Sequence, residues 1–513
     1  MNIRRAKQEI MNTIEAYLEK DEYGDYKIPE IRQRPVLLMG PPGIGKTQIM
    51  EQIAGESDLA LVAYTITHHT RQSAVGLPYI TKKIYGGREY QVTEYTMSEI
   101  IASVCDTMEA SGKKEGILFI DEINCVSETL APTMLQFLQQ KTFGNQKVPQ
   151  GWIIVSAGNP PEYNKSVRDF DVVTLDRVKV IDVDPDFEVW KAYAYEAGIH
   201  NAVISYLDMH RENFFRCEST VDGKRFVTAR GWEDLSQIIC AYERTGRKVD
   251  TEVVVQYLQY PKIAQDFANY LELFYKYRRD YHVDSILSGE IPEETLNRLR
   301  YAPFDERLQI VSLLLARLCG SFRQVRASDR EVSHLYSFLR SCREGEGNEA
   351  SGTFQGAARY EALLNDLKKT VRARIDAGQN EKELKEEYRG VFRTLEEWLP
   401  AVQRAPKEEA WEMLRSRFSG VRDDLEAQIQ SASELLEYAF DFMEAAFSES
   451  QEMVFFITEL SANADAMWLI GETECPRYYR YNKALLFEDR GAEIRKQLDE
   501  IRSEMNGALP DQP

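Results

Sequence analysis

Long hydrophobic runs are missing from the sequence. Its apolar stretches, such as MVFFI at 453–457, are far shorter than the roughly 20 residues that a membrane-spanning helix needs. The N-terminal residues mix both charges, whereas a secretion signal places basic residues before an apolar run. We therefore expect a cytoplasmic protein with no membrane span.

The sequence also lacks the cysteine spacings of disulfide scaffolds and metal sites. Its seven cysteines are scattered without a CxxC pair, and their odd number is typical of free thiols in a reducing compartment. We expect neither a disulfide framework nor a cysteine-bound metal.

The chain has fewer basic than acidic residues. The chain has 63 lysines and arginines against 83 aspartates and glutamates, which gives a net charge of −20 at pH 7. Such a field repels nucleic-acid phosphates and anionic lipid at long range. The most basic patch, LKKTVRARI at 367–375, is short and is followed by acidic residues. The composition thus disfavours nucleic acid as a partner.

What the sequence does contain is length for about three domains and a clear α/β pattern. Short apolar runs alternate with helical segments between residues 36 and 183, which is typical of a parallel sheet with crossover helices. The predicted strands are VLLM (36–39), LALVAYTI (59–66), ILFI (117–120), WIIVSA (152–157) and VKVIDV (178–183). Two hairpins are predicted as insertions, at 79–95 around Gly86-Gly87 and, with a weaker signal, at 143–152.

After about residue 184 the sequence indicates helices and no further strands. Ser431 and Glu434 resemble a capping box and predict a helix that begins there. The residues 343–353 combine glycine with acidic and small side chains, as linkers do. The expected organisation is an N-terminal helix with an α/β domain (1–184), a helical domain (185–285), a helical connector (286–342), the linker (343–353) and a helical C-terminal domain (354–513).

The segment RPVLLMGPPGIGKTQIMEQIAG at 34–55 contains the pattern G-x-x-x-x-G-K-[ST] between a strand and a helix. Its glycines let the backbone wrap around phosphates, Lys46 reaches the β and γ oxygens, and the Thr47 hydroxyl ligates Mg²⁺. The guanine motif NKxD is missing, which favours ATP over GTP. The residues expected to bind the nucleotide are Gly40, Pro41, Pro42, Gly43, Ile44, Gly45, Lys46, Thr47 and Gln48.

Polar side chains follow two further strands. In GILFIDEIN, Asp121 is placed to hold Mg²⁺ and Glu122 to deprotonate an attacking water; the alternative is a solvated acidic helix start. In WIIVSAGNP, Asn159 is placed to bond the water or the γ phosphate; the alternative is an Asn-Pro turn. The order of these segments is the one that adjacent strands of one sheet need to converge on one nucleotide.

These residues resemble the MoxR-type branch of the AAA+ ATPases, which is related to dynein-like and chelatase-like ATPases. The resemblance covers about residues 30–280 and rests on GPPGIGKT, GILFIDEIN, KVPQGWIIVSAGNPPEYN (147–164), LDRV (175–178) and TARGWEDLS (228–236). It implies that the helical domain is a lid and that Asn159 is the sensor 1 residue. It further implies that Arg230 is the sensor 2 residue and that Arg177 is an arginine finger for a neighbouring subunit. Because Val178 stands where the family usually has Phe, Arg168 remains a second candidate for the finger.

A planar arginine fork suits phosphoryl transfer, and a finger supplied by a neighbour requires a closed ring. The resemblance implies a hexamer with chaperone-like activity in remodelling or assembling a protein partner, and a partner with a von Willebrand factor A-type domain. Two alternatives stay open: a nucleotide-gated scaffold or switch with little turnover, and a DNA-directed AAA+ motor of the restriction type.

Overall fold

The computed structural model describes residues 1–68, 71–143, 146–163, 167, 170–220, 223–343, 354–376, 381–448 and 450–483. The described residues form two compact units. One comprises Met1–Lys191, His210–Ala264 and Ser341–Lys407, and the other comprises the described parts of Ala192–Met209, Gln265–Arg340 and Glu408–Pro513. The predicted domain boundaries stay predictions, and residues 344–353 of the predicted linker lie outside the described residues.

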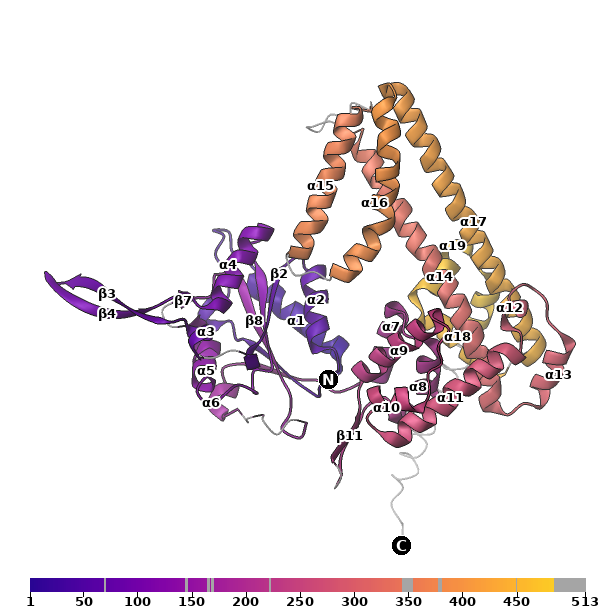
Figure 1. The fold of residues 1–513 in the computed structure, drawn as a ribbon, viewed down its shortest axis with the longest axis horizontal. Helices are drawn as coiled ribbons and strands as arrows, with labels where there is room; N and C mark the ends of the chain where they lie inside the picture. The colour runs from indigo at the N-terminus through magenta and orange to yellow at the C-terminus, as the bar shows by residue number, and fades with distance from the viewer. Residues whose placement is uncertain are drawn as a thin grey trace, which may run out of the picture. The chain divides into compact units, whose positions relative to one another are not determined.

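A five-stranded parallel sheet forms the centre of the first unit, and its strand order is β2-β5-β8-β1-β9 (Figure 1). All five predicted strands are confirmed: β1 Val36–Met39, β2 Ala60–Thr65, β5 Gly116–Asp121, β8 Trp152–Gly158 and β9 Lys179–Asp182. The central position of β8 explains its composition, because every one of its residues is buried. The predicted α/β class with a phosphate-loop topology is thereby confirmed.

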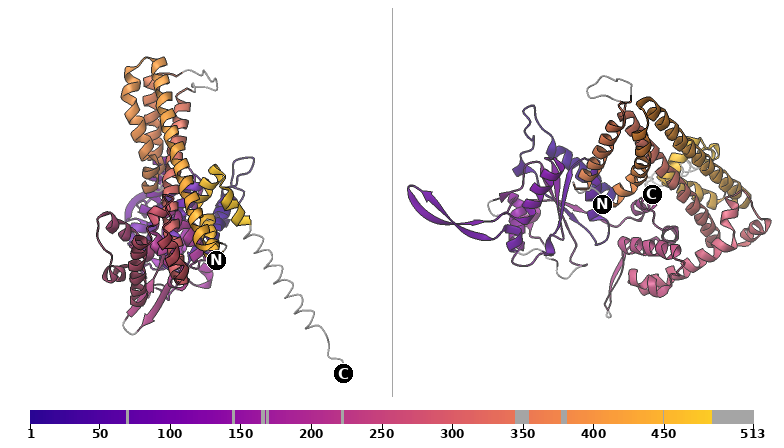
Figure 2. Two further views of the ribbon diagram at one scale, coloured as in Figure 1. Left: turned by 90° about the vertical axis from the view of Figure 1, so that its right-hand side faces the viewer. Right: turned by 45° about the horizontal axis from the view of Figure 1, so that its top comes forward.

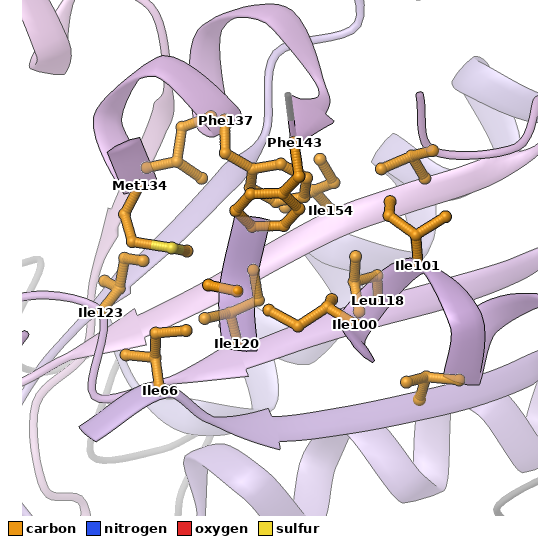
Figure 3. Close-up of a cluster of buried hydrophobic side chains, with 14 of the residues drawn as sticks. Ile66, Ile100, Ile101, Leu118, Ile120, Ile123, Met134, Phe137, Phe143 and Ile154 are labelled. Carbon is orange, nitrogen blue, oxygen red and sulfur yellow. The ribbon is translucent and has the colours of Figure 1, made fainter. Parts of the chain in front are cut away.

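Side chains that alternate along the strands build one hydrophobic core on each face of the sheet. One core contains Leu118, Ile120 and Ile154, and the other contains Ile117, Phe119 and Val155. Figure 3 shows the first core, where Ile100 and Ile101 of one helix and Met134 and Phe137 of another cover the strands. The helices α4 Glu99–Ser111 and α5 Ala131–Gln140 cover this face. The helices α1 Ile3–Leu18 and α2 Lys46–Glu56 cover the other face.

Both predicted hairpins are present. β3 Pro78–Tyr85 and β4 Arg88–Tyr95 pair in antiparallel register and extend away from the sheet (Figures 1 and 2). Gly86 and Gly87 connect them with φ angles of 57° and 80°, which favour glycine. The second hairpin is short, with β6 Thr142–Phe143 paired to β7 Gln146–Lys147.

The prediction that strands end near residue 184 is wrong. β10 Arg216–Thr220 and β11 Gly223–Val227 form an antiparallel pair within the predicted helical lid. Their residues are mostly polar and half exposed, so they lack the apolar run that marks the strands of the main sheet. The helices in this part of the chain are α7 Phe187–Ala197, α8 Asn201–Met209, α9 Ala229–Arg244, α10 Thr251–Tyr257 and α11 Pro261–Asp280.

The remaining elements are helical, as predicted. They are α12 Val283–Ile286, α13 Glu293–Tyr301, α14 Phe304–Ser341, α15 Ala357–Asp376, α16 Glu381–Arg404, α17 Lys407–Phe447, α18 Gln451–Ala462 and α19 Ala464–Thr473. The capping box at Ser431 is wrong, because Ser431 lies inside α17 and the preceding residues already form helix. No single helix of the described residues is long and apolar enough to cross a membrane; α18 and α19 meet that test only as a pair bent by 93°.

Candidate functional site

The predicted phosphate-site residues meet at the carboxyl edge of the sheet. The phosphate loop follows β1, Asp121 ends β5, and Asn159 follows β8, and these three strands are neighbours. Parallel strands place their carboxyl ends at one edge, so these segments converge although Lys46 and Asn159 are 113 residues apart in the sequence. The convergence that the sequence predicts is present.

The conformation of the phosphate loop depends on its glycines. Gly43 and Gly45 have φ angles of 74° and 91°, in the left-handed region that side chains disfavour. A Cβ atom on Gly40 would lie 2.5 Å from the carbonyl oxygen of Val183. The loop leads directly into α2, which begins at Lys46, so its amides gather at a helix N-terminus. Pro41, Pro42, Ile44 and Gln48 complete the predicted segment around these positions.

Lys46 is the buried cation of the site, with 8% of its surface exposed. Its Nζ donates hydrogen bonds to the carbonyl of Gly40 (2.6 Å), the carbonyl of Pro41 (2.9 Å) and Oδ1 of Asn159 (2.8 Å). Burial lowers the pKa of Lys46 to about 8, and the nearby Arg230 lowers it further while Asp121 opposes the shift. The ammonium therefore joins the phosphate loop to the end of β8.

Thr47 and Asp121 supply the oxygen ligands that Mg²⁺ prefers. The Thr47 hydroxyl donates to Oδ2 of Asp121 across 2.9 Å, so both oxygens face the same point. Elsewhere in the described part of the chain, no group of three or more His, Cys, Asp or Glu side chains could hold a metal. A hydroxyl and one carboxylate fit a Mg²⁺ ion whose other ligands are nucleotide phosphates and water.

Glu122 is held in a fixed position beside Asp121. Its backbone has a φ of 56°, which is unusual for a residue with a side chain. Its N–H donates to Oδ1 of Asp121 (2.8 Å), and its Oε2 accepts a hydrogen bond from the Thr67 hydroxyl (3.1 Å). Thr67 lies just after β2 and was not predicted as a site residue; no sequence motif marks it.

Asn159 is anchored by a second asparagine that the sequence analysis missed. Nδ2 of Asn124 donates to the carbonyl of Asn159 (2.8 Å), and Oδ1 of Asn124 accepts from the N–H of Asn159 (3.3 Å). Asn124 is 3% exposed. A buried amide whose two ends bond one residue fixes the backbone of that residue. Its position in the sequence, two residues after the predicted base Glu122, could have indicated that Asn124 belongs to the site.

Arg230 lies close to the phosphate loop. Its backbone N–H donates to the carbonyl of Gly43 across 3.3 Å, at the beginning of α9. Thr228 caps this helix, since its hydroxyl accepts from the N–H of Gly231 at 3.2 Å. A Cβ atom on Gly43 would lie 3.1 Å from Thr228 and 3.3 Å from Cβ of Arg230. The close approach of the helix explains why glycine occupies that position.

Arg177 does not lie beside the phosphate-site residues of its own chain. It lies two residues before β9, whose first residue Lys179 pairs with Val36, the first residue of β1. Arg177 is thus at the amino edge of the sheet, whereas the phosphate loop follows the carboxyl end of β1. Its exposed side chain lines a hollow together with Arg34 and Lys141. The other candidate finger, Arg168, lies outside the described residues.

The match to a protein-family model agrees with this architecture. Residues 36–173 match the family model described as "ATPase family associated with various cellular activities (AAA)". Among solved structures, a point mutant of RuvB from Thermotoga maritima is similar with 14% identity and a TM-score of 0.28, over 50% of this chain and 69% of that chain. None of the curated proteins matches the sequence. The chain thus contains an AAA-type phosphate-loop domain with a five-stranded parallel sheet, followed by a large helical region.

Proposed function

We propose that the protein is a Mg²⁺-dependent ATPase of the AAA+ class. The observation that carries this proposal is the hydrogen-bonded convergence of Lys46, Thr47, Asp121 and Asn159 with Glu122 at one edge of the sheet. Lysine, hydroxyl, carboxylate and amide groups are the set that phosphoryl transfer from a nucleoside triphosphate requires.

Each side chain has a distinct role in the proposed reaction. Lys46 contacts the β and γ oxygens of ATP, while Thr47 and Asp121 hold Mg²⁺, which neutralises charge that develops on the phosphates. Glu122 accepts the proton of the attacking water. Asn159 orients that water or the γ phosphate, and Arg230 contacts the γ phosphate from the lid.

Arg177 acts on the site of a neighbouring subunit in this proposal. Its place at the amino edge of the sheet supports a role in trans, because it lies at the opposite edge from the phosphate loop of its own chain. A finger of this kind requires a ring in which each subunit faces the next, and we propose a hexamer.

The MoxR-type resemblance leads us to propose a cytoplasmic machine that remodels or assembles a protein partner. A partner with a von Willebrand factor A-type domain fits that class. We propose that residues 1–184, 185–285, 286–342 and 354–513 are separate domains, which truncated proteins can test. The net charge of −20 disfavours nucleic acid as the client.

The Glu122→Gln variant tests the proposed function. The amide keeps the shape of the side chain but cannot accept the proton, so we expect MgATP affinity to persist and turnover to fall by about 100-fold or more. Calorimetry measures binding and phosphate release measures turnover. The matched control is Glu109→Gln on the exposed face of α4, which should behave as wild type. Unchanged turnover in Glu122→Gln would remove the assigned base, and a wild-type protein that takes up no MgATP would overturn the proposal.

A further inference from the structure

Two contacts join the loop that follows Asn159 to the β10–β11 hairpin. Nζ of Lys224 donates to the backbone carbonyls of Glu162 (3.2 Å) and Tyr163 (2.9 Å). The Tyr163 ring meets the Phe215 ring edge-on, with 6.1 Å between the centroids. Lys224 of the hairpin therefore bonds the backbone of this loop, and Phe215, the residue just before β10, contacts its Tyr163 side chain.

The link between Asn159 and these contacts is short and stiff. Pro160 and Pro161 follow Asn159 directly, and their rings fix two consecutive φ angles. The N–H of Tyr163 closes a turn on the carbonyl of Pro160 at 3.1 Å. Because this short segment has few free backbone angles, a displacement of the carbonyls that Lys224 binds should also displace Asn159.

The other end of β11 reaches the phosphate loop. β11 ends at Val227, and the next residue, Thr228, caps α9 and lies against Gly43. The N–H of Arg230 bonds the carbonyl of the same glycine. One strand of five residues therefore touches the loop after Asn159 through Lys224 and leads into the segment that touches the phosphate loop.

The hairpin is braced against the rest of the lid. The N–H of Phe226 donates to the carbonyl of Gln259 at 3.1 Å. On the paired strand, Glu218 accepts hydrogen bonds from the Tyr260 hydroxyl (2.9 Å) and from Nε of Arg216 (2.7 Å). Because these bonds fix both strands, Lys224 moves with the lid segment and not as an independent surface lysine.

We propose that Lys224 is a positioning residue that couples the lid to Asn159. The contacts form a closed path around the phosphate site. Lys46 donates a hydrogen bond to Asn159. The backbone carbonyls of the loop after Asn159 accept hydrogen bonds from Lys224. The strand of Lys224 leads to Thr228 and Arg230, which contact Gly43 in the loop that carries Lys46. The inference rests on the proposed function, since it concerns where the Asn159 amide stands when ATP is hydrolysed.

Lys224→Met tests the coupling, because methionine keeps much of the aliphatic chain and removes the donor. We expect kcat to fall about three- to fivefold while KM and the affinity for a fluorescent ATP analogue stay within about twofold, as expected for one exposed hydrogen-bonding group. Lys224→Arg keeps a donor and should restore kcat. The matched control is Lys248→Met, since Lys248 is exposed beyond the end of α9. An equal loss in the control, or no loss in Lys224→Met, would overturn the inference.

A double-mutant cycle tests whether Lys224 acts through Asn159. In an Asn159→Ala background, Lys224→Met should cause no further loss of kcat, and independent multiplicative losses would overturn the coupling.

Hydrogen exchange separates this inference from the proposed function. The amides of Glu162 and Tyr163 should exchange faster in Lys224→Met than in wild type, whether or not the protein hydrolyses ATP. An inactive wild type would refute the ATPase proposal alone, whereas unchanged exchange of these amides would refute the role of Lys224 alone.

Discussion

The hydroxyl of Thr67 donates a hydrogen bond of 3.1 Å to Oε2 of Glu122 and so links the segment just after β2 to the proposed catalytic base just after β5. We expect this hydrogen bond to fix the direction in which the Glu122 carboxylate accepts a proton.

Replacing Thr67 by Val keeps the branched shape and removes this donor. We expect kcat for ATP to fall about three- to tenfold with little change in KM, because the orientation of Glu122 affects hydrolysis more than binding. Thr67→Ser keeps the hydroxyl and is the matched control. Steady-state phosphate release measures both variants, and equal kcat values for Val and Ser would contradict the role.

A Gly40→Ala change should impair the phosphate loop. The added Cβ would lie 2.5 Å from the carbonyl oxygen of Val183, so either the loop or β9 must shift. Since the loop amides must converge on the phosphates, we expect MgATP affinity to fall by at least about tenfold. The control is Gly55→Ala in α2, where an added Cβ meets nothing within 4 Å and helix propensity favours alanine. Calorimetric titration of both variants decides, and equal affinities would contradict this account.

Arg177→Ala tests the proposed finger in trans. The variant alone should be nearly inactive, with MgATP affinity close to that of wild type, because Arg177 lies at the opposite edge of its own sheet. Mixed with Glu122→Gln subunits it should regain part of the activity, since some interfaces then pair an intact Arg177 with an intact Glu122. Arg34→Ala, at another cation that lines the same hollow, is the control. A mixture that stays inactive would argue for a site completed within one chain.

Lys141 should make the stability of the protein depend on pH. It is 6% exposed, and burial lowers its pKa from 10.5 to about 8, with Glu30 opposing the shift. Below pH 8 the native state holds a buried charge. Between pH 8 and 10.5 the unfolded chain binds a proton that the native protein has released, so this contribution to stability rises with pH.

Lys141→Met removes that buried charge. Below pH 8 the variant should be more stable than wild type by up to about 3 kcal/mol, and the difference should shrink as the pH rises to 10.5. Urea unfolding at pH 7, 9 and 10.5 measures the free energy of unfolding, with Lys248→Met at an exposed lysine after α9 as the control. A stability difference that is constant across this range would contradict the expectation.

The local pattern was enough to predict the sheet and the centre of the site. Each strand of the sheet is an apolar run, and the phosphate loop, the acidic pair and Asn159 each stand at the end of one run. Residues that act through long-range contacts were missed. Thr67 lies in no motif, and Asn124 ends the GILFIDEIN segment without a role that the segment itself indicates. Only the structure shows that these two residues bond Glu122 and Asn159.

The β10–β11 pair was missed for a different reason. Its strands expose polar side chains on both sides and bury little, so the alternation that marks a strand is weak. No pattern in the sequence therefore marks Lys224. At Ser431 the error was the reverse, because a local capping pattern was outweighed by helix-forming residues on both sides of it.

The length of β1 has a consequence for how the protein responds to dilution. Four residues of strand span about 10 Å between the level of Lys179 and the start of the phosphate loop. Under the role that we propose for Arg177, a solitary chain therefore cannot bring this arginine to its own phosphate site. Turnover per chain should accordingly rise with protein concentration and level off once the chains are associated. Cells could then set the activity through the abundance of the protein alone, without any separate inhibitor.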